Sequence, residues 1–574
     1  MVIGRENRFI QSHMVSGKKY GDWLLLANGL VFALVLNQLA SLYFFRVDLT
    51  EESRYTMKAP TRALLESLDD DVYVEVYLEG NINAGFQRLY KAVGETLEEF
   101  RVYSNNKVHY NFLDPAAAKG QEARKEFMLE LASKGIQPMN IIANTDGRRT
   151  EKLVFPGAVI SYGGAEEGVM LVKGNRAQGS DEVLNQSIES LEYQFALAIE
   201  KLAGLDRKQV GWVTGHGELD SVRGAGFSAA LRASFDVVPT RLNKSLPTEL
   251  DVLIIARPTQ IYTAVDKFYL DQFIMRGGSV LVLMDRLDAS MDSVSMPNYF
   301  ARPLETGLED PLFHYGVRVN PDAVQDLQAL RFPVITGNLG GKPQMTPMEW
   351  PFFPLINQYA DHPATRNMDA TPLRMVSSLD TVKAVGIRKT PLLFTSAYAR
   401  RVASPVKMSI NDLRKEIRPE NFNAGPIPVA YLLEGEFASV FKNRFLPEGI
   451  DSVGYRSKGK PAKILVVGDG DLARNEINPR NGQPQSLGFD AFTNTTYANA
   501  ELLVNMVAFL ADDHGLITAR TKDIKIRPLD KEQIRAERWK WQAINLGFPV
   551  LLLVGLGMAK AWWRRRRYGS FIRK

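Results

Sequence analysis

The sequence predicts an α/β protein that is held in a membrane by one helix near each end. Three observations lead to this fold class. A charge-free apolar stretch near each terminus is long enough to cross a bilayer. The residues between these stretches alternate strand patterns with helix patterns. Several of the strands are near-continuous apolar runs, which are typical of parallel strands buried on both faces. We therefore expect two α/β units outside the cytoplasm, the second with a parallel, doubly wound sheet.

The first apolar stretch, residues 24–45, reads LLLANGLVFALVLNQLASLYFF and carries no charge. A cleaved signal peptide is the alternative, but the apolar run is longer than a typical signal-peptide core and no A-x-A cleavage site is evident. We expect an uncleaved anchor spanning residues 23–45. Its Asn37 and Gln38 are predicted to contact another membrane helix, because hydrocarbon offers amides no partner. Asn28 lies in the same stretch, and a position at the membrane interface is the alternative for it.

The second apolar stretch lies at residues 541–563, with Pro549 inside its charge-free part. Tryptophans flank it at 539 and 541 on one side and at 562 and 563 on the other, as in the aromatic belts of membrane helices. The alternative is a buried core helix. The flanking tryptophans and the four arginines at 564–567 favour a membrane span.

The charge distribution indicates the topology. The first 22 residues carry a net charge of +2 and residues 560–574 a net charge of +7, whereas the whole chain carries +5, so the remainder carries −4. Basic tails can indicate nucleic-acid binding. Because both tails adjoin apolar stretches, we expect instead no nucleic-acid partner and two cytoplasmic termini, by the positive-inside rule.

The first α/β unit is expected at residues 46–180. Alternating apolar residues predict a strand at 72–78, and apolar residues at helical spacing predict a helix at 85–103. The further elements expected are a strand at 108–115, a helix at 120–134, and strands at 140–144, 152–162 and 168–174. This order of elements resembles a thioredoxin-like domain. The chain has no cysteine, so the redox chemistry of that fold is excluded.

A long amphipathic helix is predicted at residues 181–203, with a continuous apolar stripe from Leu184 to Leu202. We expect residues 181–205 to bridge the two α/β units. A helix that binds a partner protein is the alternative interpretation of this stripe.

The second α/β unit is expected at residues 206–520. It begins with a strand in the segment 209–220, followed by a glycine-rich turn and a helix from about residue 226. Further strands are predicted at 235–242, 251–258, 279–285 and 463–471, with a helix at about 263–275 and a closing helix at 498–513. Residues 286–462 form an insertion that holds 18 of the 29 prolines. Such a stretch is too proline-rich for long helices, and we expect irregular excursions and short strands there, or partial disorder. The remaining predicted segments are the cytoplasmic tails 1–22 and 564–574 and a linker at 521–540.

The sequence excludes several classes of enzyme. Without cysteine there is no thiol nucleophile and no thiolate metal site, and no two of the six histidines have metal-ligand spacing on a helix. The nearest approach to a P-loop, GNLGGKPQ at 337–344, lacks its spacing and its hydroxyl. No nucleophile elbow and no dinucleotide-binding glycine motif is present. We expect no catalytic residues, no cofactor and no metal.

Two acidic, glycine-rich loops are the candidate ligand sites. His216, Glu218 and Asp220 in GHGELD follow a predicted strand, where α/β proteins collect their sites. Asp469 and Asp471 in GDGD follow another. These side chains could hold a cation or a ligand hydroxyl or act as acid and base. Tight strand-to-helix turns are the alternative explanation. If the two loops converge, a shared pocket is expected.

Several strings along the chain carry a family resemblance. They are VTGHGELD (213–220), DVLIIARPTQIY (251–262), FIMRGGSVLVLMD (273–285), YGVRVNPDAVQD (315–326), PVAYLLEGEFASVFKNRF (428–445) and ILVVGDGD (464–471). Together with the two anchors, they resemble the gliding-motility-associated ABC transporter component G (GldG) family and related auxiliary proteins of ABC-2-type transport systems. In that family the second unit is similar to a glutamine-amidotransferase-like fold. The nucleophilic cysteine of active amidotransferases is missing here, so their activity is not implied.

The resemblance implies a role in transport. It implies a polytopic ABC permease and a cytoplasmic ATPase subunit as partners, a bacterial inner membrane location with the main domains in the periplasm, and a role in gliding motility. Three hypotheses follow: a non-catalytic, substrate-binding-like auxiliary subunit of an ABC transporter, an envelope scaffold that forms homo- or hetero-oligomers, and an exterior hydrolase using His216, Glu218, Asp469 or Asp471.

Overall fold

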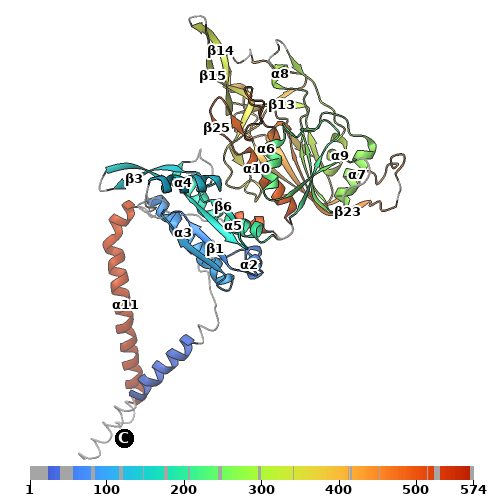
Figure 1. Ribbon diagram of the computed structural model, residues 1–574. Helices are drawn as coiled ribbons and strands as arrows, with labels where there is room; N and C mark the ends of the chain where they lie inside the picture. Colours follow the sequence, from blue (N-terminus) through green and yellow to red (C-terminus); the bar gives the residue numbers. More distant parts are fainter. Residues whose placement is uncertain are drawn as a thin grey trace, which may run out of the picture. The chain divides into compact units, whose positions relative to one another are not determined.

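The fold is described from a computed structural model of the full chain (Figure 1). It describes residues 23–38, 56–78, 84–114, 121–145, 148–173, 179–204, 207–242, 249–294, 296, 299–339, 342–410, 413, 417–450, 453–512, 515–521 and 531–568. The chain divides into two compact units, Met1–Asp523 and Ile524–Lys574. The protein is a mixed α/β structure with several sheets, as the alternation of patterns predicts.

The first α/β region contains a four-stranded sheet in the order β2-β1-β5-β6. Strand β1 pairs in parallel with β2 and antiparallel with β5, and β5 pairs antiparallel with β6. Alternate residues of β1 are buried, as the apolar alternation predicts. The elements are α2 (Ala59–Glu66), β1 (Val72–Val76), α3 (Ala84–Tyr103), β2 (Val108–Phe112), α4 (Gln121–Ser133), β3 (Met139–Thr145), β4 (Arg148–Val154), β5 (Gly157–Tyr162), β6 (Ala165–Met170) and α5 (Ser180–Leu202).

The expected single strand at 152–162 is wrong. The chain forms two strands there, β4 and β5, which belong to different sheets. Among the described residues, strand β4 pairs with β3 alone, as a separate hairpin, whereas β5 joins the four-stranded sheet. The break falls at Phe155 and Pro156. Proline has no N–H group to donate to a strand ladder, so it marks the point where the chain leaves one sheet for the other.

Helix α5 confirms the amphipathic pattern and contacts both α/β regions. It packs on α3, β5 and β6 of the first region and on η6 (Leu516–Thr521) near the end of the second. The Glu192 carboxylate accepts a 2.8 Å hydrogen bond from the backbone N–H of Lys58. On the other side, the Asn367 amide donates a 3.2 Å hydrogen bond to Glu189. The apolar stripe is therefore an internal face of the fold.

The second region is built on an eight-stranded sheet in the order β16-β19-β22-β23-β10-β9-β7-β8. Strands β23, β10, β9, β7 and β8 are parallel to one another. The elements of this parallel part are β7 (Gln209–Val213), α6 (Ala225–Arg232), β8 (Asp236–Thr240), β9 (Leu250–Ala256), α7 (Ala264–Met275), β10 (Ser279–Leu283), β23 (Lys458–Val467), η5 (Asp471–Ala473) and α10 (Asn499–Ala511). Their order along the chain agrees with the predicted order.

Both faces of this sheet are covered by helices, as expected for a doubly wound sheet (Figure 1). Residues Val252 and Ile254 of β9 belong to one apolar core together with residues of α6 and α10. The alternate residues Leu253 and Ile255 belong to a second core with residues of α7 and α9 (Glu309–Tyr315). Side chains alternate between the two faces of a strand. A strand buried on both faces therefore needs the continuous apolar run seen in its sequence.

The proline-rich insertion is more regular than expected. Two of its strands, β19 (Ile387–Phe394) and β22 (Pro428–Ala438), extend the main sheet in antiparallel fashion beside β23. A long hairpin, β14 (Ala329–Leu339) and β15 (Lys342–Ile356), projects from it. Two prolines of the insertion lie where a ladder bond is dispensable or the ladder is irregular. Pro428 is the first residue of β22, and a register shift follows Pro391 in β19.

The described helices of the insertion are short, as its proline content predicts. Its other elements are α8 (Met291–Val294), β11 (Phe300–Ala301), β12 (Val317–Val319), β13 (Asp322–Asp326), β16 (Gln358–Tyr359), β17 (Thr371–Pro372), β18 (Leu379–Thr381), β20 (Ala399–Ala403), β21 (Val406–Lys407) and η4 (Pro419–Asn421). A small hairpin, β24 (Phe489–Asp490) and β25 (Thr495–Thr496), precedes α10.

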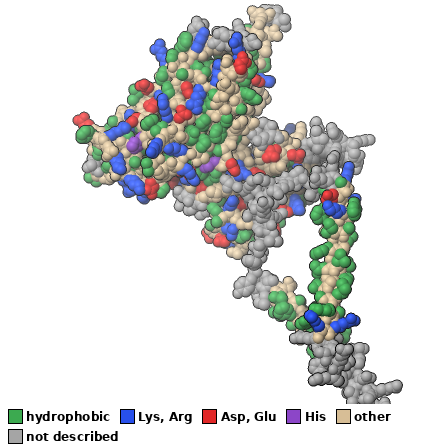
Figure 2. Space-filling model, turned by 180° about the vertical axis from the view of Figure 1, so that it is seen from behind, with side chains coloured by type: hydrophobic (Ala, Val, Ile, Leu, Met, Phe, Trp, Pro, Cys, Tyr) green, Lys and Arg blue, Asp and Glu red, His purple; other side chains and the backbone are tan. Residues whose placement is uncertain are grey.

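Two apolar helices match the predicted anchors. Helix α11 (Lys531–Tyr568) is long and apolar enough over Ile534–Trp563 to cross a membrane. It begins within the segment expected as a linker. Figure 2 shows hydrophobic side chains along it and basic side chains near its C-terminal end. A shorter apolar helix covers Trp23–Gln38, and residues 39–45 of the predicted span lie outside the described residues.

Together these helices indicate membrane anchoring. The large side chains of α11 are open to solvent, with Leu551 71% and Leu553 69% exposed. Water solvates such a surface unfavourably, at roughly 25 cal/mol per Å² of apolar area, whereas lipid does not.

Candidate functional site

The parallel strands place both predicted loops at one edge of the main sheet. Strand β8 lies on one side of β7 and β9 lies on the other. The chain order β7, β8, β9 therefore reverses direction at β7, which makes a topological switch point between β7 and β9. Ligands of open α/β sheets bind outside the carboxyl ends of the strands at such a point. GHGELD follows β7 at this position, and the segment 257–263 follows β9.

His216 lies at the switch point in a compact polar cluster with residues of the β9–α7 connection. Its ring stacks on Tyr262, with the ring centroids 3.8 Å apart and an interplanar angle of 18°. Its Nε2 lies 3.0 Å from Oδ2 of Asp266, and its Nδ1 lies 3.3 Å from Oε1 of Glu218. The Tyr262 hydroxyl donates a 2.5 Å hydrogen bond to the same Glu218 oxygen. We call these four residues the His216 cluster.

The backbone closes this cluster. The carbonyl oxygen of His216 accepts hydrogen bonds of 2.9 Å from the N–H groups of Thr259 and Gln260. The next residue, Gly217, has φ +72°, and a β-carbon at this position would lie 2.0 Å from Oγ1 of Thr259. Only glycine fits this approach without displacing the opposite loop. The crevice between β7 and β9 is therefore bridged by the protein itself.

The charges of the His216 cluster are set by burial and hydrogen bonding. Burial, with the Glu218 carboxylate beside it, raises the pKa of Tyr262 well above its ordinary value, so the phenol stays a donor. Burial alone would raise the pKa of Asp266, but hydrogen bonds from Thr263 and His216 outweigh it and lower the pKa. Asp266 also closes the capping box at the start of α7. Every carboxylate of the cluster thus has a structural partner.

Asp220 takes no part in the His216 cluster. It is exposed, and its Oδ1 accepts hydrogen bonds from the N–H groups of Val222 (3.0 Å) and Arg223 (2.7 Å). An aspartate in this position stabilises the turn before a helix. GHGELD therefore divides into two buried residues that face the β9–α7 connection and one exposed residue that holds a turn.

Asp469 and Asp471 lie at the same sheet edge in a second cluster, beyond the ends of β10 and β23. Asp469 is fully buried, and its carboxylate accepts hydrogen bonds from the N–H groups of Asp471 (2.8 Å) and Arg374 (2.7 Å). Asp471 Oδ1 lies 2.9 Å from Nε of Arg257. The same Nε lies 3.0 Å from Oδ2 of Asp285, whose Oδ1 accepts a 2.6 Å bond from Gly470 N–H.

Arginines supply the positive charge of this second cluster. Arg257 bridges Asp285 and Asp471, and Arg474 lies 3.3 Å from Asp471. Arg374 pairs with Glu476. We call these six residues, together with Asp469, the arginine–aspartate cluster. The Arg257 side chain lies between the carboxylates of Asp285 and Asp471. Among the described residues, no group of three or more His, Asp and Glu side chains is arranged to hold a metal ion.

This cluster holds more carboxyl groups than guanidinium groups, and the excess appears in the pKa values. Burial, then the neighbouring Asp471, raises the pKa of Asp285 to about 7. Burial and the nearby Asp285 raise the pKa of Asp469 well above its ordinary value. Burial opposes the charge of Arg257, but Asp471 and Asp285 outweigh it and raise its pKa. Both buried carboxyl groups therefore favour the protonated form more than an exposed aspartate does.

The two predicted loops meet only indirectly. Asn475, shortly after GDGD, accepts a 2.7 Å hydrogen bond from Gly226 N–H, and its own N–H donates to Arg223 O at 2.7 Å. No hydrogen bond or ion pair joins GHGELD to GDGD directly among the residues described. The cavity beside Asp469 and Asp471 measures about 20 Å³, which is room for a single water. It is too small for an organic ligand.

Asp285 and Arg257 are members that the sequence reasoning missed. Both follow apolar runs that were assigned as buried strands, and a charged residue directly after such a run was the available signal. A larger cavity was also missed. It lies in the insertion, measures about 390 Å³, and is lined by residues of several short strands. No single segment of sequence carries a signal for it.

A family profile supplies the identification. The profile described as an ABC-type uncharacterized transport system matches residues 207–506, which is more than half of the chain. The chain belongs to this family. It is an auxiliary component of an ABC-type transport system, which confirms the coarser part of the resemblance drawn from its strings. The matched residues contain both charged clusters and the whole proline-rich insertion.

Other comparisons are less informative. A profile for a domain of unknown function matches residues 51–161, in the first α/β region. An uncharacterized protein of Borreliella burgdorferi is 22% identical over 456 residues, which cover 78% of this chain and 81% of that protein. The solved structure of the mmIFT52 N-terminal domain aligns over 55% of this chain and 100% of its own length, with 13% identity and a TM-score of 0.29.

Proposed function

We propose that this chain is a non-catalytic, substrate-binding-like subunit of an ABC transporter, with two membrane helices that dock on a polytopic permease. The observation that carries the proposal is the family match over residues 207–506 in a chain that also bears two apolar helices. The proposal includes a cytoplasmic ATPase subunit as the energy source, because the chain has no P-loop of its own.

The proposed topology is a two-pass protein of the bacterial inner membrane with both termini in the cytoplasm and the α/β regions in the periplasm. The basic residues at both ends of the chain support it. Residues 46–180 form the first, thioredoxin-like domain in this proposal, supported by the strand order β2-β1-β5-β6. Residues 206–520 form the second, glutamine-amidotransferase-like domain, and residues 181–205 bridge the two.

Asn37 and Gln38 are proposed contacts with a permease helix. They are the last two described residues of the helix Trp23–Gln38, and they lie in an otherwise apolar surface. Amide side chains in lipid hydrogen-bond across helices, which contributes roughly 0.6 to 2 kcal/mol each. The observed clusters support a non-catalytic role for the exterior domains, because His216, Glu218, Asp469 and Asp471 are each held by neighbouring protein groups.

The proposal is tested by purifying the tagged full chain in mild detergent and identifying its partners by mass spectrometry. A polytopic permease and an ATP-binding subunit in near-stoichiometric amounts are expected. The double variant Asn37→Leu, Gln38→Leu tests the membrane contact, and it should lower the recovery of the permease. Recovery of the chain alone, or with envelope structural proteins only, would overturn the transporter role and favour the scaffold.

The topology has its own test, which the lack of cysteine makes clean. Val385 is 90% exposed on the second region, so Val385→Cys should react with a membrane-impermeant maleimide in spheroplasts. Ser570→Cys in the basic tail should react only after lysis. Labelling of Ser570→Cys in sealed spheroplasts would contradict the two-pass topology.

The finer motility role predicts that deleting the gene abolishes surface gliding while growth continues.

A further inference from the structure

The cavity of about 390 Å³ in the insertion has the size of a small-molecule site. Its walls come from β13, β15, β20 and β21 and from the chain around η4. These segments are far apart in sequence, so the cavity is a product of the folded insertion. It is separate from both charged clusters at the edge of the main sheet.

Three basic side chains line the cavity: Arg400, Lys407 and Arg418. None of them forms an ion pair with a carboxylate of the described residues. The neighbouring Arg401 and Arg388 differ in this respect, because they pair with Asp380 and Glu434. No described Asp or Glu side chain lines the cavity. The described lining is therefore positively charged without an internal counter-charge.

Arg400 is held in place by neutral groups. Its Nε donates a 2.7 Å hydrogen bond to Oε1 of the buried Gln325, and its guanidinium lies 4.6 Å from the ring centroid of Phe422. Its terminal nitrogens have no hydrogen-bond or ion-pair partner among the residues that the structure describes. Burial alone lowers the pKa of Arg400, with no carboxylate to offset it. An oriented guanidinium with unused donors is suited to bind a carboxylate or phosphate.

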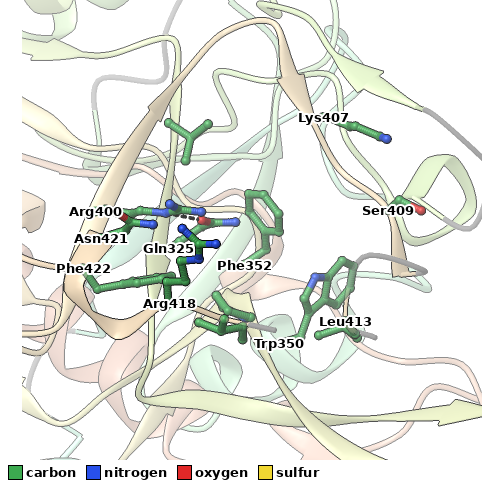
Figure 3. A pocket seen from close by; sticks show the side chains of 13 residues that line it. Gln325, Trp350, Phe352, Arg400, Lys407, Ser409, Leu413, Arg418, Asn421 and Phe422 are labelled. Carbon is green, nitrogen blue, oxygen red and sulfur yellow. Dashed lines mark hydrogen bonds between the residues drawn. The ribbon is translucent and has the colours of Figure 1, made fainter. Parts of the chain in front are cut away.

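Two buried aromatic side chains form an apolar part of the lining. Trp350 is 2% exposed and Phe352 6% exposed, and both pack into an aromatic cluster. Figure 3 shows Arg400 and Arg418 on one side of the cavity, Lys407 and Ser409 on the other, and the two aromatic rings between them. The cavity thus joins cationic ends to a flat apolar wall.

We propose that this cavity binds a small organic anion in which a carboxylate or phosphate group is attached to a flat apolar body. Arg400 and Arg418 bind the anionic group, and Trp350 and Phe352 contact the apolar body. The inference concerns the chain itself and does not depend on the proposed association with a permease. Its failure and the failure of the transporter role are therefore distinguishable.

The test uses the full chain in lipid nanodiscs and fluorine NMR of small probes, with empty nanodiscs as the blank. The anionic probes are 4-fluorophenyl phosphate and 4-fluorobenzoate, and 4-fluorobenzyl alcohol is the neutral probe. At least one anion is expected to bind with a Kd below about 1 mM and more tightly than the alcohol. The ratio of the two Kd values shows whether the cavity prefers a phosphate or a carboxylate group. Displacement of a probe by inorganic phosphate shows that the anionic group is recognised without the ring.

Variants link binding to the cavity. Arg400→Gln and Arg418→Gln should each weaken anion binding about tenfold or more, as expected for a lost charged hydrogen bond. Arg388→Gln, the matched control on the surface, should bind as the parent chain does. Arg418 is exposed, so its replacement leaves the fold intact, and Arg400→Lys restores the charge if Arg400→Gln unfolds. No anion binding up to about 10 mM, equal binding of the alcohol, or unchanged affinity in both glutamine variants would refute the proposal.

Discussion

Replacing Arg257 by methionine tests the arginine–aspartate cluster most directly. Arg257 follows β9 with a φ of +58°, and its Nε bridges Asp285 and Asp471 at 3.0 and 2.9 Å. The side chain of Arg257 is 16% exposed, that of Asp285 11% and that of Asp471 6%. Methionine keeps an unbranched side chain of similar length, so the substitution removes mainly the guanidinium. It leaves the buried Asp285 carboxyl group without its cationic partner, whereas Asp471 keeps Arg474 at 3.3 Å.

The expected loss of stability is large. Removing one partner of a buried ion pair costs about 3 to 5 kcal/mol, because an uncompensated buried charge remains. The matched control is Arg388→Met. Arg388 pairs with Glu434 through a side chain that is 73% exposed, and such surface pairs contribute about 0 to 1 kcal/mol. The assay is urea unfolding of the full chain in detergent, followed by the fluorescence of the buried tryptophans.

The pH dependence gives a second readout. The pKa of Asp285 is about 7 in the folded chain, above its ordinary value of 3.8, so the folded chain retains a proton that the unfolded chain releases. Its contribution to stability is present below pH of about 4 and is lost as the pH rises to about 7. Without Arg257 this pKa rises further.

The destabilisation by Arg257→Met should therefore be greater at pH of about 8 than at about 5. A loss no larger than that of Arg388→Met, or one that is equal at both pH values, would refute the reasoning.

Two further predictions use the same unfolding assay. Tyr262→Phe removes the 2.5 Å hydrogen bond to the buried Glu218 carboxylate and should cost about 1.5 to 3 kcal/mol, and a loss below about 0.5 would contradict it. Gly468→Ala places a β-carbon 2.2 Å from the carbonyl oxygen of Ser377 and should destabilise by about 1 to 3 kcal/mol. Its control, Gly94→Ala in α3, meets no atom closer than 3.7 Å and should stabilise by about 0.5 to 1 kcal/mol; destabilisation at both sites would contradict the steric argument.

The anion-binding proposal and the predicted membrane contacts differ in how far sequence alone could lead. Asn37 and Gln38 stand out because polar residues interrupt an apolar run, which is a local signal. Arg400 and Arg418 carry no such signal, because a basic residue between short strands is ordinarily solvated. Their significance depends on which acidic residues lie near them, and this is decided by contacts across the fold.

The proline-rich insertion shows where local patterns are insufficient. Proline content predicts short helices, and the described helices there are short. The same content suggested only short strands, yet β22 runs for 11 residues beside β23. Its one proline, Pro428, is its first residue, and its ladder is formed with residues of a distant segment, β23.

The sequence by itself determined the fold class, the two apolar helices, and most of the order of helices and strands in the two α/β regions, the division of residues 152–162 into two strands excepted. These properties depend on the spacing of apolar residues within one segment, so a single chain displays them. Only the tertiary structure decided which polar residues meet. The Gly470–Asp285 hydrogen bond joins residues 185 positions apart, and Arg257 completes the cluster from a third strand end. Such meetings depend on strand order and register, because parallel strands that are distant in sequence bring their carboxyl ends to one edge.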